Sequence, residues 1–412
     1  YDLLAERSPQ PAIPALVAAA AYVYAPYLLI NIYVRGAIAE LGAQMLLPWI
    51  LWSFRRIWRS PDPQAYVWGG ALSLGLLAWT HTISLLTVPP LLVAYLLMLG
   101  AGRADWRPRA RYSAFAILWA MLVSSFYWIP LILEKDYVSE IGFTISRTLM
   151  LPVSFYKWNT LVSTSLRYPY PEDPPFPLGL VQVAGAVVGV LLALRQPREW
   201  KFWMGDLAVC GVMMTGLAQP LWLNNDILPI IQFPWRLLAL MQFPVALLFG
   251  LVVASIRAPV VRAGASAAVI CLLVWAYLPH LPWATFLSPT GSTLNMPMNA
   301  YLEAEYKQIV EEAVTASSVQ EFRPRWADET LELDPTTVPG QPGGEAKIAL
   351  LAANPFRFQL RVESEQGTAL RFANYYFPGW RARLDGTTPL NAYPTTNLGL
   401  LTFDVPPGAH SV

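Results

Sequence analysis

Two arginines lie next to apolar stretches of the chain, where a fixed positive charge is unfavourable. Arg35 is part of "YAPYLLINIYVRGAIAE", five residues before Glu40, and Arg236 is part of "IIQFPWRLL". A charge at membrane depth is costly unless it is paired or faces a wet cavity, so both arginines are candidates for a binding site. The alternative is an interfacial anchor, in which Arg35 reaches toward water and the neighbouring tyrosines form an aromatic belt.

The stretch around Arg236 combines several features that favour an anion. Pro234 suits the first turn of a helix, so Arg236 would lie near a helix N-terminus, whose positive dipole end attracts negative charge. A guanidinium group and free backbone N–H groups can both bind a phosphate. Asp226 and Gln232 precede the same helix and are further candidates for substrate binding. The alternative is a Trp–Arg anchor formed with Trp235 at the membrane surface.

His81 in "THTISLL" is the next candidate, because it is expected at a turn between two apolar segments. Histidine can hydrogen-bond a phosphate or a hydroxyl group and changes charge near neutral pH. The alternative is a turn histidine that is exposed to water or bound to a backbone carbonyl.

For Arg35 and Glu40, a spacing of five residues on a continuous helix predicts different faces, so a direct ion pair is not implied.

Evidence for a metal site is weak in this sequence. The two cysteines and three histidines do not follow a metal-ligand spacing, so no metal and no cofactor are predicted. Carboxylates in "EKDYVSEIG" (residues 134–142) could act as a general base or hold a divalent cation. A solvated loop is the alternative for this stretch, because clusters of charge usually face water.

The composition indicates a membrane protein. Of 412 residues, 55% are hydrophobic and 13% are charged, and the mean hydropathy is +0.40. Globular proteins have about 45–50% apolar and about 25% charged residues. The net charge of +1 argues against nucleic-acid binding, which needs a clustered basic surface. The lipid bilayer is therefore the first expected partner.

Apolar runs of near-membrane length predict a mainly α fold, a polytopic helix bundle of about nine spans. The expected spans are 11–30, 41–57, 66–81, 83–100, 112–133, 178–194, 202–218, 237–256 and 263–279. Basic connections are retained on the cytoplasmic side. They fall at alternate turns, 53–63, 102–111, 195–201 and 256–262, so we expect the start of the chain inside and residues after 280 outside.

Three parts are predicted along the chain. Residues 1–283 form the transmembrane domain, with a long outer loop at 134–177, and residues 284–344 form a polar connector. Residues 345–412 alternate apolar and polar positions between Asn-Pro, Pro-Gly and Asp-Gly turns, which predicts a truncated extracytoplasmic β-sandwich.

Four stretches occur in a familiar order: "YAPYLLINIYVRGAIAE", "THTISLL", "QFPWRLL" and "YYFPGWRARLDGTTPLNAY". In this order they resemble the bacterial multi-pass family labelled 6-pyruvoyl-tetrahydropterin synthase-related and the neighbouring YfhO-like membrane proteins. Those families are similar to the GT-C superfamily of membrane glycosyltransferases, which use polyprenyl-phosphate sugar donors at the outer membrane face. The resemblance implies that Arg35, His81 and Arg236 lie near a donor pocket. It also implies a catalytic carboxylate in a loop upstream of Tyr1, so no catalytic residue is assigned.

The leading hypothesis is therefore a GT-C-like bacterial enzyme of the plasma (inner) membrane and cell envelope, which transfers a sugar from a polyprenyl-phosphate donor to an acceptor. Its substrate-binding residues would be Arg35, Glu40, His81, Asp226, Gln232 and Arg236. Two alternatives remain open: a transporter or flippase of lipid-linked saccharides, and a non-catalytic envelope scaffold. A transporter would have charges along a midplane route and paired repeats with broken helices.

Overall fold

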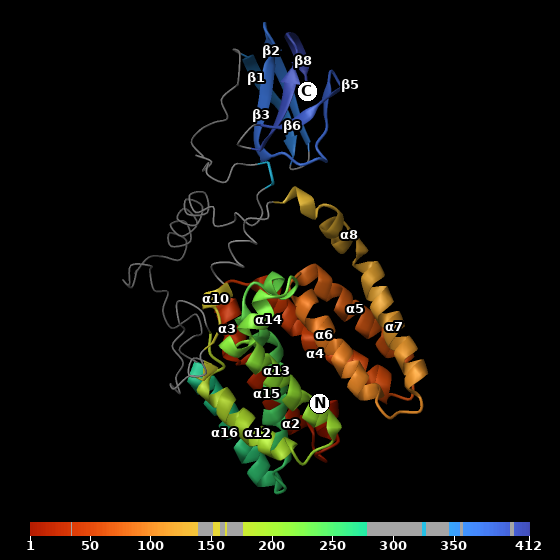
Figure 1. Cartoon of the computed structure of the whole chain (residues 1–412), viewed down its shortest axis with the longest axis vertical. Coiled ribbons are helices and arrows are strands. Elements are labelled where there is room, and N and C mark those ends of the chain that lie inside the picture. The colour runs from red at the N-terminus through yellow and green to blue at the C-terminus, as the bar shows by residue number, and fades with distance from the viewer. Residues whose placement is uncertain are drawn as a thin grey trace, which may run out of the picture. The chain divides into compact units, whose positions relative to one another are not determined.

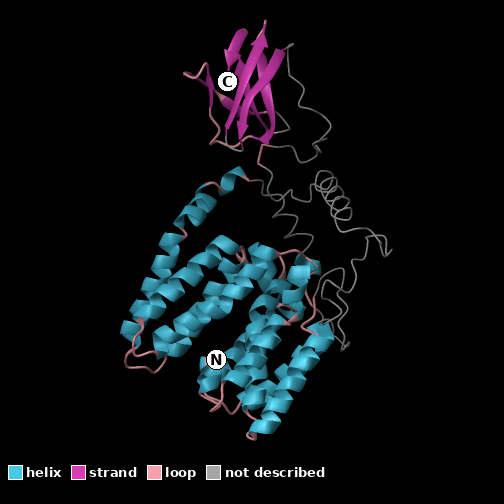
Figure 2. Ribbon diagram, turned by 180° about the vertical axis from the view of Figure 1, so that it is seen from behind, coloured by secondary structure: helices cyan, strands magenta, loops and turns pink. Residues whose placement is uncertain are grey.

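The computed structural model describes residues 1–33, 35–138, 151–156, 161–162, 176–277, 324–326, 346–354, 357–395 and 399–412. These residues are mainly helical, with a small β region toward the C-terminal end of the sequence (Figure 2). They divide into two compact units, which are described separately: a helical unit and a β unit (Figure 1). Most of the predicted connector at 284–344 and most of the predicted outer loop at 134–177 lie outside the described residues.

Each of the nine segments predicted as a span is helical. The long helices are α2 (Ala12–Val23), α3 (Pro26–Tyr33), α4 (Ile38–Arg59), α5 (Gln64–Thr80), α6 (Ser84–Gly100), α7 (Trp106–Val123), α8 (Ser125–Leu133), α12 (Leu180–Ala193), α13 (Arg198–Met213), α15 (Leu238–Ala254) and α16 (Pro259–Tyr277). Shorter helical turns are α1 (Asp2–Ala5), η1 (Lys135–Tyr137), α10 (Leu151–Val153), η3 (Gly216–Ala218), α14 (Gln219–Leu223), η4 (Leu228–Ile231) and η5 (Pro234–Leu237).

Among the described helices, two are long and apolar enough to cross a membrane, Pro234–Ala254 and Pro259–Tyr277. The number rises to four if each of two bent pairs is one span: α2 with α3, bent by 47°, and α7 with α8, bent by 67°. The sequence predicted a single span for each pair, at 11–30 and 112–133. The first bend lies just before Pro26, and at the second the Ser124 hydroxyl donates to the carbonyl of Ala120, a bond that often bends helices.

Helix α15 forms the centre of the helical unit and packs against α2, α12, α13 and α16. Most of its side chains are buried, as are the large rings of Trp200, Trp203 and Tyr95 around it. Helix α4 contains Pro48, which has no N–H to donate to the carbonyl of Gln44. The hydroxyl of Tyr22 on α2 donates to that carbonyl instead, at 2.6 Å, so α4 continues through the proline.

The β unit contains two three-stranded antiparallel sheets and a hairpin. Its strands are β1 (Ala346–Asn354), β2 (Arg357–Ser364), β3 (Thr368–Tyr375), β4 (Ala382–Leu384), β5 (Thr388–Leu390), β6 (Ala392–Pro394), β7 (Leu400–Val405) and β8 (Gly408–Ser411). One sheet has the order β1-β2-β8, the other has the order β3-β7-β6, and β4 pairs with β5. Alternate residues of β2 point inward, so Leu360 and Val362 share a core with Leu370 and Val405 of the second sheet.

Candidate functional site

Arg35 and Glu40 form a direct ion pair, which the spacing on a continuous helix did not predict. The helix is interrupted: α3 ends at Tyr33, α4 begins at Ile38, and Gly36 between them has a φ of +59°. This conformation is accessible to glycine at little cost and turns the chain back on itself. As a result, Nη1 of Arg35 lies 2.9 Å from Oε2 of Glu40.

The carboxylate of Glu40 is buried, and both of its oxygens have partners. Oε1 accepts a hydrogen bond from the hydroxyl of Tyr27, and Oε2 accepts one from Arg35. The guanidinium of Arg35 also donates to Oδ1 of Asn31 and to the Tyr27 hydroxyl. Helix α3 therefore supplies two polar side chains, Tyr27 and Asn31, that hold the ion pair in place. Burial of a charge in this way is sustainable only when such partners are present.

Arg236 lies in the short turn η5, directly before the long helix α15. Pro234 occupies the first turn of η5, as predicted, and Nη1 of Arg236 donates to the carbonyl oxygen of Ile231 at 3.0 Å. The Cζ atom of Arg236 is 5.8 Å from the ring centroid of Trp235, and the Cζ atom of Arg35 is 4.6 Å from the same centroid. Both distances fall within the range of cation–π attraction, so one buried indole holds two guanidinium groups.

His81 is the residue at which α5 ends, and its backbone is extended. Its Nδ1 atom lies 2.9 Å from the hydroxyl of Ser84 in the first turn of α6. The charges of Glu40, Arg236 and Arg35 are near enough to influence the half-buried imidazole electrostatically. Four of the predicted residues, Arg35, Glu40, His81 and Arg236, thus lie in one region although they come from three separate parts of the chain, and Trp235 contacts the two arginines. We refer to these four residues as the arginine cluster.

The other two predicted residues lie in the turn that precedes Arg236. Gln232 is half-buried and has a φ of +68°, an uncommon conformation for a side chain other than glycine. The positive φ of Gln232 changes the direction of the chain between η4 and η5 and so helps to position Arg236. Asp226 differs from the other candidates in its exposure, because it lies at the surface. The turn around it is closed by the side-chain oxygen Oδ1 of Asn225, which accepts from the backbone N–H groups of Ile227 and Leu228.

No family model matches the chain, and no curated protein matches it. The geometry of the site is therefore the basis for inferring its function. Among the residues that the structure describes, no group of three or more His, Cys, Asp or Glu side chains could hold a metal ion. Within the arginine cluster, two guanidinium groups lie against one indole ring, and Glu40 forms an ion pair with Arg35.

A second buried ion cluster joins α4 to α13. Glu199 accepts from Arg55 at 2.7 Å and 3.2 Å, from Arg59 at 3.2 Å and from the hydroxyl of Tyr95 at 2.5 Å. Arg55 also pairs with Glu6 at 2.6 Å. The sequence placed Arg55 in a cytoplasmic connection, but it is buried in the last part of α4. Its partner Glu199 gave no signal in the sequence, because the two residues are 144 positions apart.

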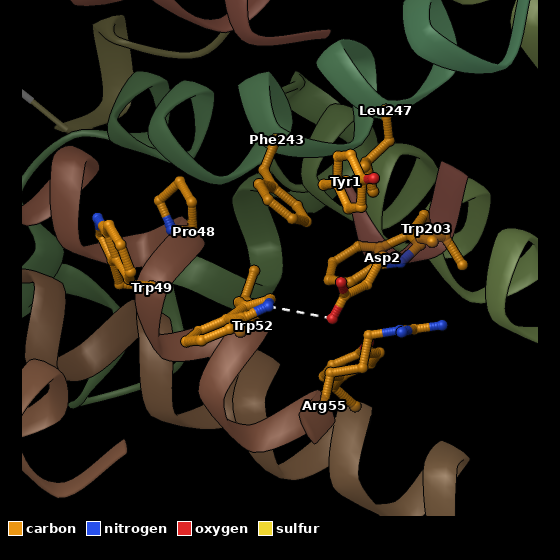
Figure 3. Close-up of a pocket in the computed structure, with 12 residues that line it drawn as sticks. Tyr1, Asp2, Pro48, Trp49, Trp52, Arg55, Trp203, Phe243 and Leu247 are labelled. Carbon is orange, nitrogen blue, oxygen red and sulfur yellow. Dashed lines mark hydrogen bonds between the residues drawn. The ribbon is translucent and has the colours of Figure 1, made fainter. Parts of the chain in front are cut away.

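A cavity of about 480 Å³ lies beside this second cluster, between α4, α13, α15 and the start of the chain. Figure 3 shows its aromatic wall, with Trp49, Trp52, Trp203 and Phe243 around it, and the hydrogen bond of 3.1 Å from Nε1 of Trp52 to Asp2. The charged groups at its edge are already paired, Asp2 with Arg56 and Arg55 with Glu199. We therefore interpret this cavity as space for an apolar group and not as a centre of chemistry.

Proposed function

We propose that the helical unit is the multi-pass part of a GT-C-like membrane glycosyltransferase. In this proposal the nine helical segments are membrane spans of a bacterial plasma membrane, and the arginine cluster and the β region face outward. The exposed apolar residues of several helices support a bilayer environment, since Leu16, Leu97 and Leu191 are each more than 60% exposed. The donor is a polyprenyl-phosphate sugar, and the acceptor is a hydroxyl compound at the outer face.

The observation that carries this proposal is the placement of two guanidinium groups, those of Arg35 and Arg236, against the single indole ring of Trp235. Two guanidinium groups held this close together favour an anion between or beside them. Arginine is well suited to a phosphate group, because its planar N–H groups can donate to two oxygens at once. The Trp235 ring, Tyr27 and Asn31 hold the guanidinium groups in place before a ligand arrives, so little ordering is needed on binding.

In the proposed reaction, the oxygen of the acceptor hydroxyl attacks the anomeric carbon of the donor sugar. The bond from that carbon to the phosphate oxygen breaks, and the polyprenyl phosphate leaves with the electron pair. Arg236 and Arg35 stabilise the negative charge that develops on the phosphate, a contribution that is commonly the largest in enzymes. A carboxylate base takes the hydroxyl proton. We assign this base to none of the described residues.

A second observation favours a lipid phosphate over a soluble anion. A cavity of about 460 Å³ with a largely apolar lining lies between α6 and α13, and Ile231 and Leu237 form part of it. Both residues are close in sequence to Arg236, and the Ile231 carbonyl accepts its hydrogen bond. An isoprenoid chain placed along Leu91 and Phe202 would therefore have its phosphate beside the arginine cluster.

Binding of polyprenyl phosphate to the purified chain in lipid nanodiscs tests the proposal. We expect polyprenyl phosphate to bind, and the uncharged polyprenol to bind at least about tenfold more weakly, because one charge-assisted contact contributes this much. Arg236→Gln should weaken phosphate binding by about tenfold or more. Arg257→Gln is the matched control, since Arg257 is exposed and follows the far end of α15, about 25 Å of helix away.

Equal binding of polyprenyl phosphate and polyprenol would refute the phosphate site. An equal effect of the Arg236 and Arg257 substitutions would also refute it, because a general loss of positive charge would then explain the result. Transfer of a labelled sugar from the lipid to an acceptor is the second measurement. It must fall with Arg236→Gln at saturating donor if the arginine stabilises the departing phosphate.

The transporter hypothesis has one observation in its favour, the two bent helix pairs. Discontinuous helices at paired positions are typical of secondary transporters. A flipping assay with a fluorescent lipid-linked saccharide separates the two functions. Flipping without formation of a glycosidic bond would favour the transporter, whereas bond formation favours the transferase.

A further inference from the structure

The β unit contains a groove that the proposed transfer reaction does not use. Its volume is about 530 Å³, and its lining comes from β2, β3, β7 and the turn before β4. Leu360, Leu401 and Phe403 contribute buried apolar surface to the lining. The rim is polar, so the groove combines an apolar base with charged edges, as ligand sites commonly do.

Three aromatic rings follow one another along this groove. The ring centroid of Phe358 lies 5.5 Å from that of Phe372 and 6.4 Å from that of Trp380. All three side chains are half-buried, so part of each ring remains accessible. The negative face of an aromatic ring attracts the weakly positive C–H groups on the face of a sugar ring. A row of accessible rings therefore suits a chain of sugar units.

Three arginines line the same groove: Arg357, Arg381 and Arg383. Arg381 directly precedes β4 and Arg383 is its second residue, and both side chains line the groove. All three are exposed, and within the described part of the chain no ion pair holds any of them. By contrast, Arg361 on β2 pairs with Glu363 at 3.3 Å.

The rim that carries Arg383 is fixed to the neighbouring strand. Asp385 has a φ of +50° in the β4–β5 turn, and its N–H donates to the carbonyl of Ser411 at 2.7 Å. Its carboxylate accepts from the N–H of Ser411 at 2.9 Å and contacts Nδ1 of His410 at 2.8 Å. This acidic side chain is therefore held by Ser411 and His410, and none of the described ion pairs joins it to an arginine of the groove.

We infer that this groove binds an anionic oligosaccharide, whose sugar faces stack on Phe358 and Trp380 and whose acidic groups meet Arg381, Arg383 and Arg357. The inference depends on the proposed function in one respect: there, the oligosaccharide is the acceptor of the transferred sugar. The groove favours a glycan over a membrane surface because its aromatic rings lie in a concavity lined on several sides. The acidic group is a carboxylate or a phosphate, and both bind guanidinium groups in the same way.

The test uses the full chain in nanodiscs and titrates it with matched oligosaccharides by calorimetry. Tetragalacturonic acid and its methyl ester share one backbone and differ only in charge, and a phosphorylated mannan oligosaccharide is the third probe. We expect one of the two acidic probes to bind and the ester to bind about tenfold more weakly. Binding should weaken further as salt rises, because the contacts are exposed.

The double variant Arg381→Gln/Arg383→Gln should lose about tenfold or more in affinity for the acidic probe. Arg361→Gln makes the same kind of change outside the groove and should alter affinity less than about twofold. Trp380→Ala should weaken the acid and the ester alike, because stacking does not depend on charge. Arg381→Lys/Arg383→Lys keeps the charge and serves as a check on folding, with partial retention of binding.

Equal affinity for acid and ester would overturn the inference, and so would the absence of binding to every probe or a loss with Arg361→Gln as large as that of the double variant. Polyprenyl-phosphate binding measured in the same nanodiscs keeps the two proposals apart. Lipid-phosphate binding without glycan binding refutes the groove alone. Glycan binding without lipid-phosphate binding refutes the proposed donor site alone.

Discussion

The ion pair of Arg35 and Glu40 gives the sharpest test of how the candidate site is held together. The side chain of Glu40 is 4% exposed and that of Arg35 is 20% exposed. Removal of one partner from a buried pair costs about 3–5 kcal/mol, because the other charge remains in a poorly solvated place. Replacement of both charges by neutral side chains costs much less, since no isolated charge is left.

A double-mutant cycle separates these terms. Arg35→Gln leaves the deeply buried carboxylate with only the Tyr27 hydroxyl, so we expect a loss of about 3 kcal/mol in the free energy of unfolding. Glu40→Gln leaves a guanidinium group that is partly exposed and still bound to Asn31, so we expect a loss of about 1–2 kcal/mol. The double variant should lose about 1–2 kcal/mol, which gives a coupling energy of about 2–3 kcal/mol.

Chemical unfolding in detergent micelles, followed by tryptophan fluorescence, measures each corner of this cycle. A coupling energy below about 0.5 kcal/mol would refute the reasoning, because residues that do not interact have additive effects within this range. The double variant has a further use. Its fold no longer contains an isolated charge at this place, so a loss of polyprenyl-phosphate binding beyond that of Glu40→Gln alone reports the contact of Arg35 with the ligand.

Three further predictions concern other parts of the molecule. The hydrogen bonds of Asp385, first to the N–H of Ser411 and then to His410, lower the pKa of Asp385 from its ordinary 3.8, and the bond to Asp385 raises the pKa of His410 above its ordinary 6.5. The stabilising contribution of Asp385 is therefore lost as pH falls through its lowered pKa, and the contribution of His410 is lost as pH rises through its raised pKa. The β unit should have its highest melting temperature between about pH 4 and 6.5. His410→Gln should remove the decline in melting temperature on the alkaline side. Glu199→Gln should lower the free energy of unfolding by about 2–3 kcal/mol in the same micelle assay, because the buried guanidinium group of Arg55 keeps only the partly exposed carboxylate of Glu6. Gly189→Ala would place a methyl group 3.0 Å from the carbonyl oxygen of Leu248 and should lower the free energy of unfolding by about 1–3 kcal/mol. Gly264→Ala, whose added methyl group meets no atom within 4 Å, should be neutral or stabilising. Thermal unfolding measures both variants.

The helices could be predicted from the sequence because each apolar run is local information. The bends could be anticipated only in part: Pro26 is visible in the sequence, whereas the effect of Ser124 depends on a rotamer that composition does not reveal. The strands followed from alternation and turn residues in the same way. The order of the strands in the sheets could not be predicted, because β2 pairs with β8 across more than forty residues.

The candidate site shows the same division between local and long-range information. Arg35, Glu40, His81 and Arg236 were recognisable because charged or titratable groups beside apolar runs are unusual. Their partners Tyr27 and Asn31 were not recognised, since a tyrosine or an asparagine near the end of an apolar helix has many ordinary explanations. The ion pair itself was missed because the argument assumed a continuous helix, whereas the glycine at position 36 interrupts it. A glycine between two charged residues, as Gly36 is between Arg35 and Glu40, is therefore a reason to test for an interrupted helix.

Pro48 makes α4 weaker at one point along its length, because one backbone hydrogen bond is missing there. The helix carries Glu40 near its beginning and Arg55 near its end, about 22 Å apart. Glu40 forms an ion pair with Arg35 in the α3–α4 connection and a hydrogen bond with Tyr27 of α3, and Arg55 forms an ion pair with Glu199 of α13. Helix α4 is therefore held by side-chain contacts at both ends. Its weakest point is Pro48, where the Tyr22 hydroxyl replaces the missing backbone donor. A ligand that displaces Glu40 would move α4 from its first residues as far as Pro48. The strain would be taken up beside the aromatic cavity of Figure 3, while the end that carries Arg55 stays in place.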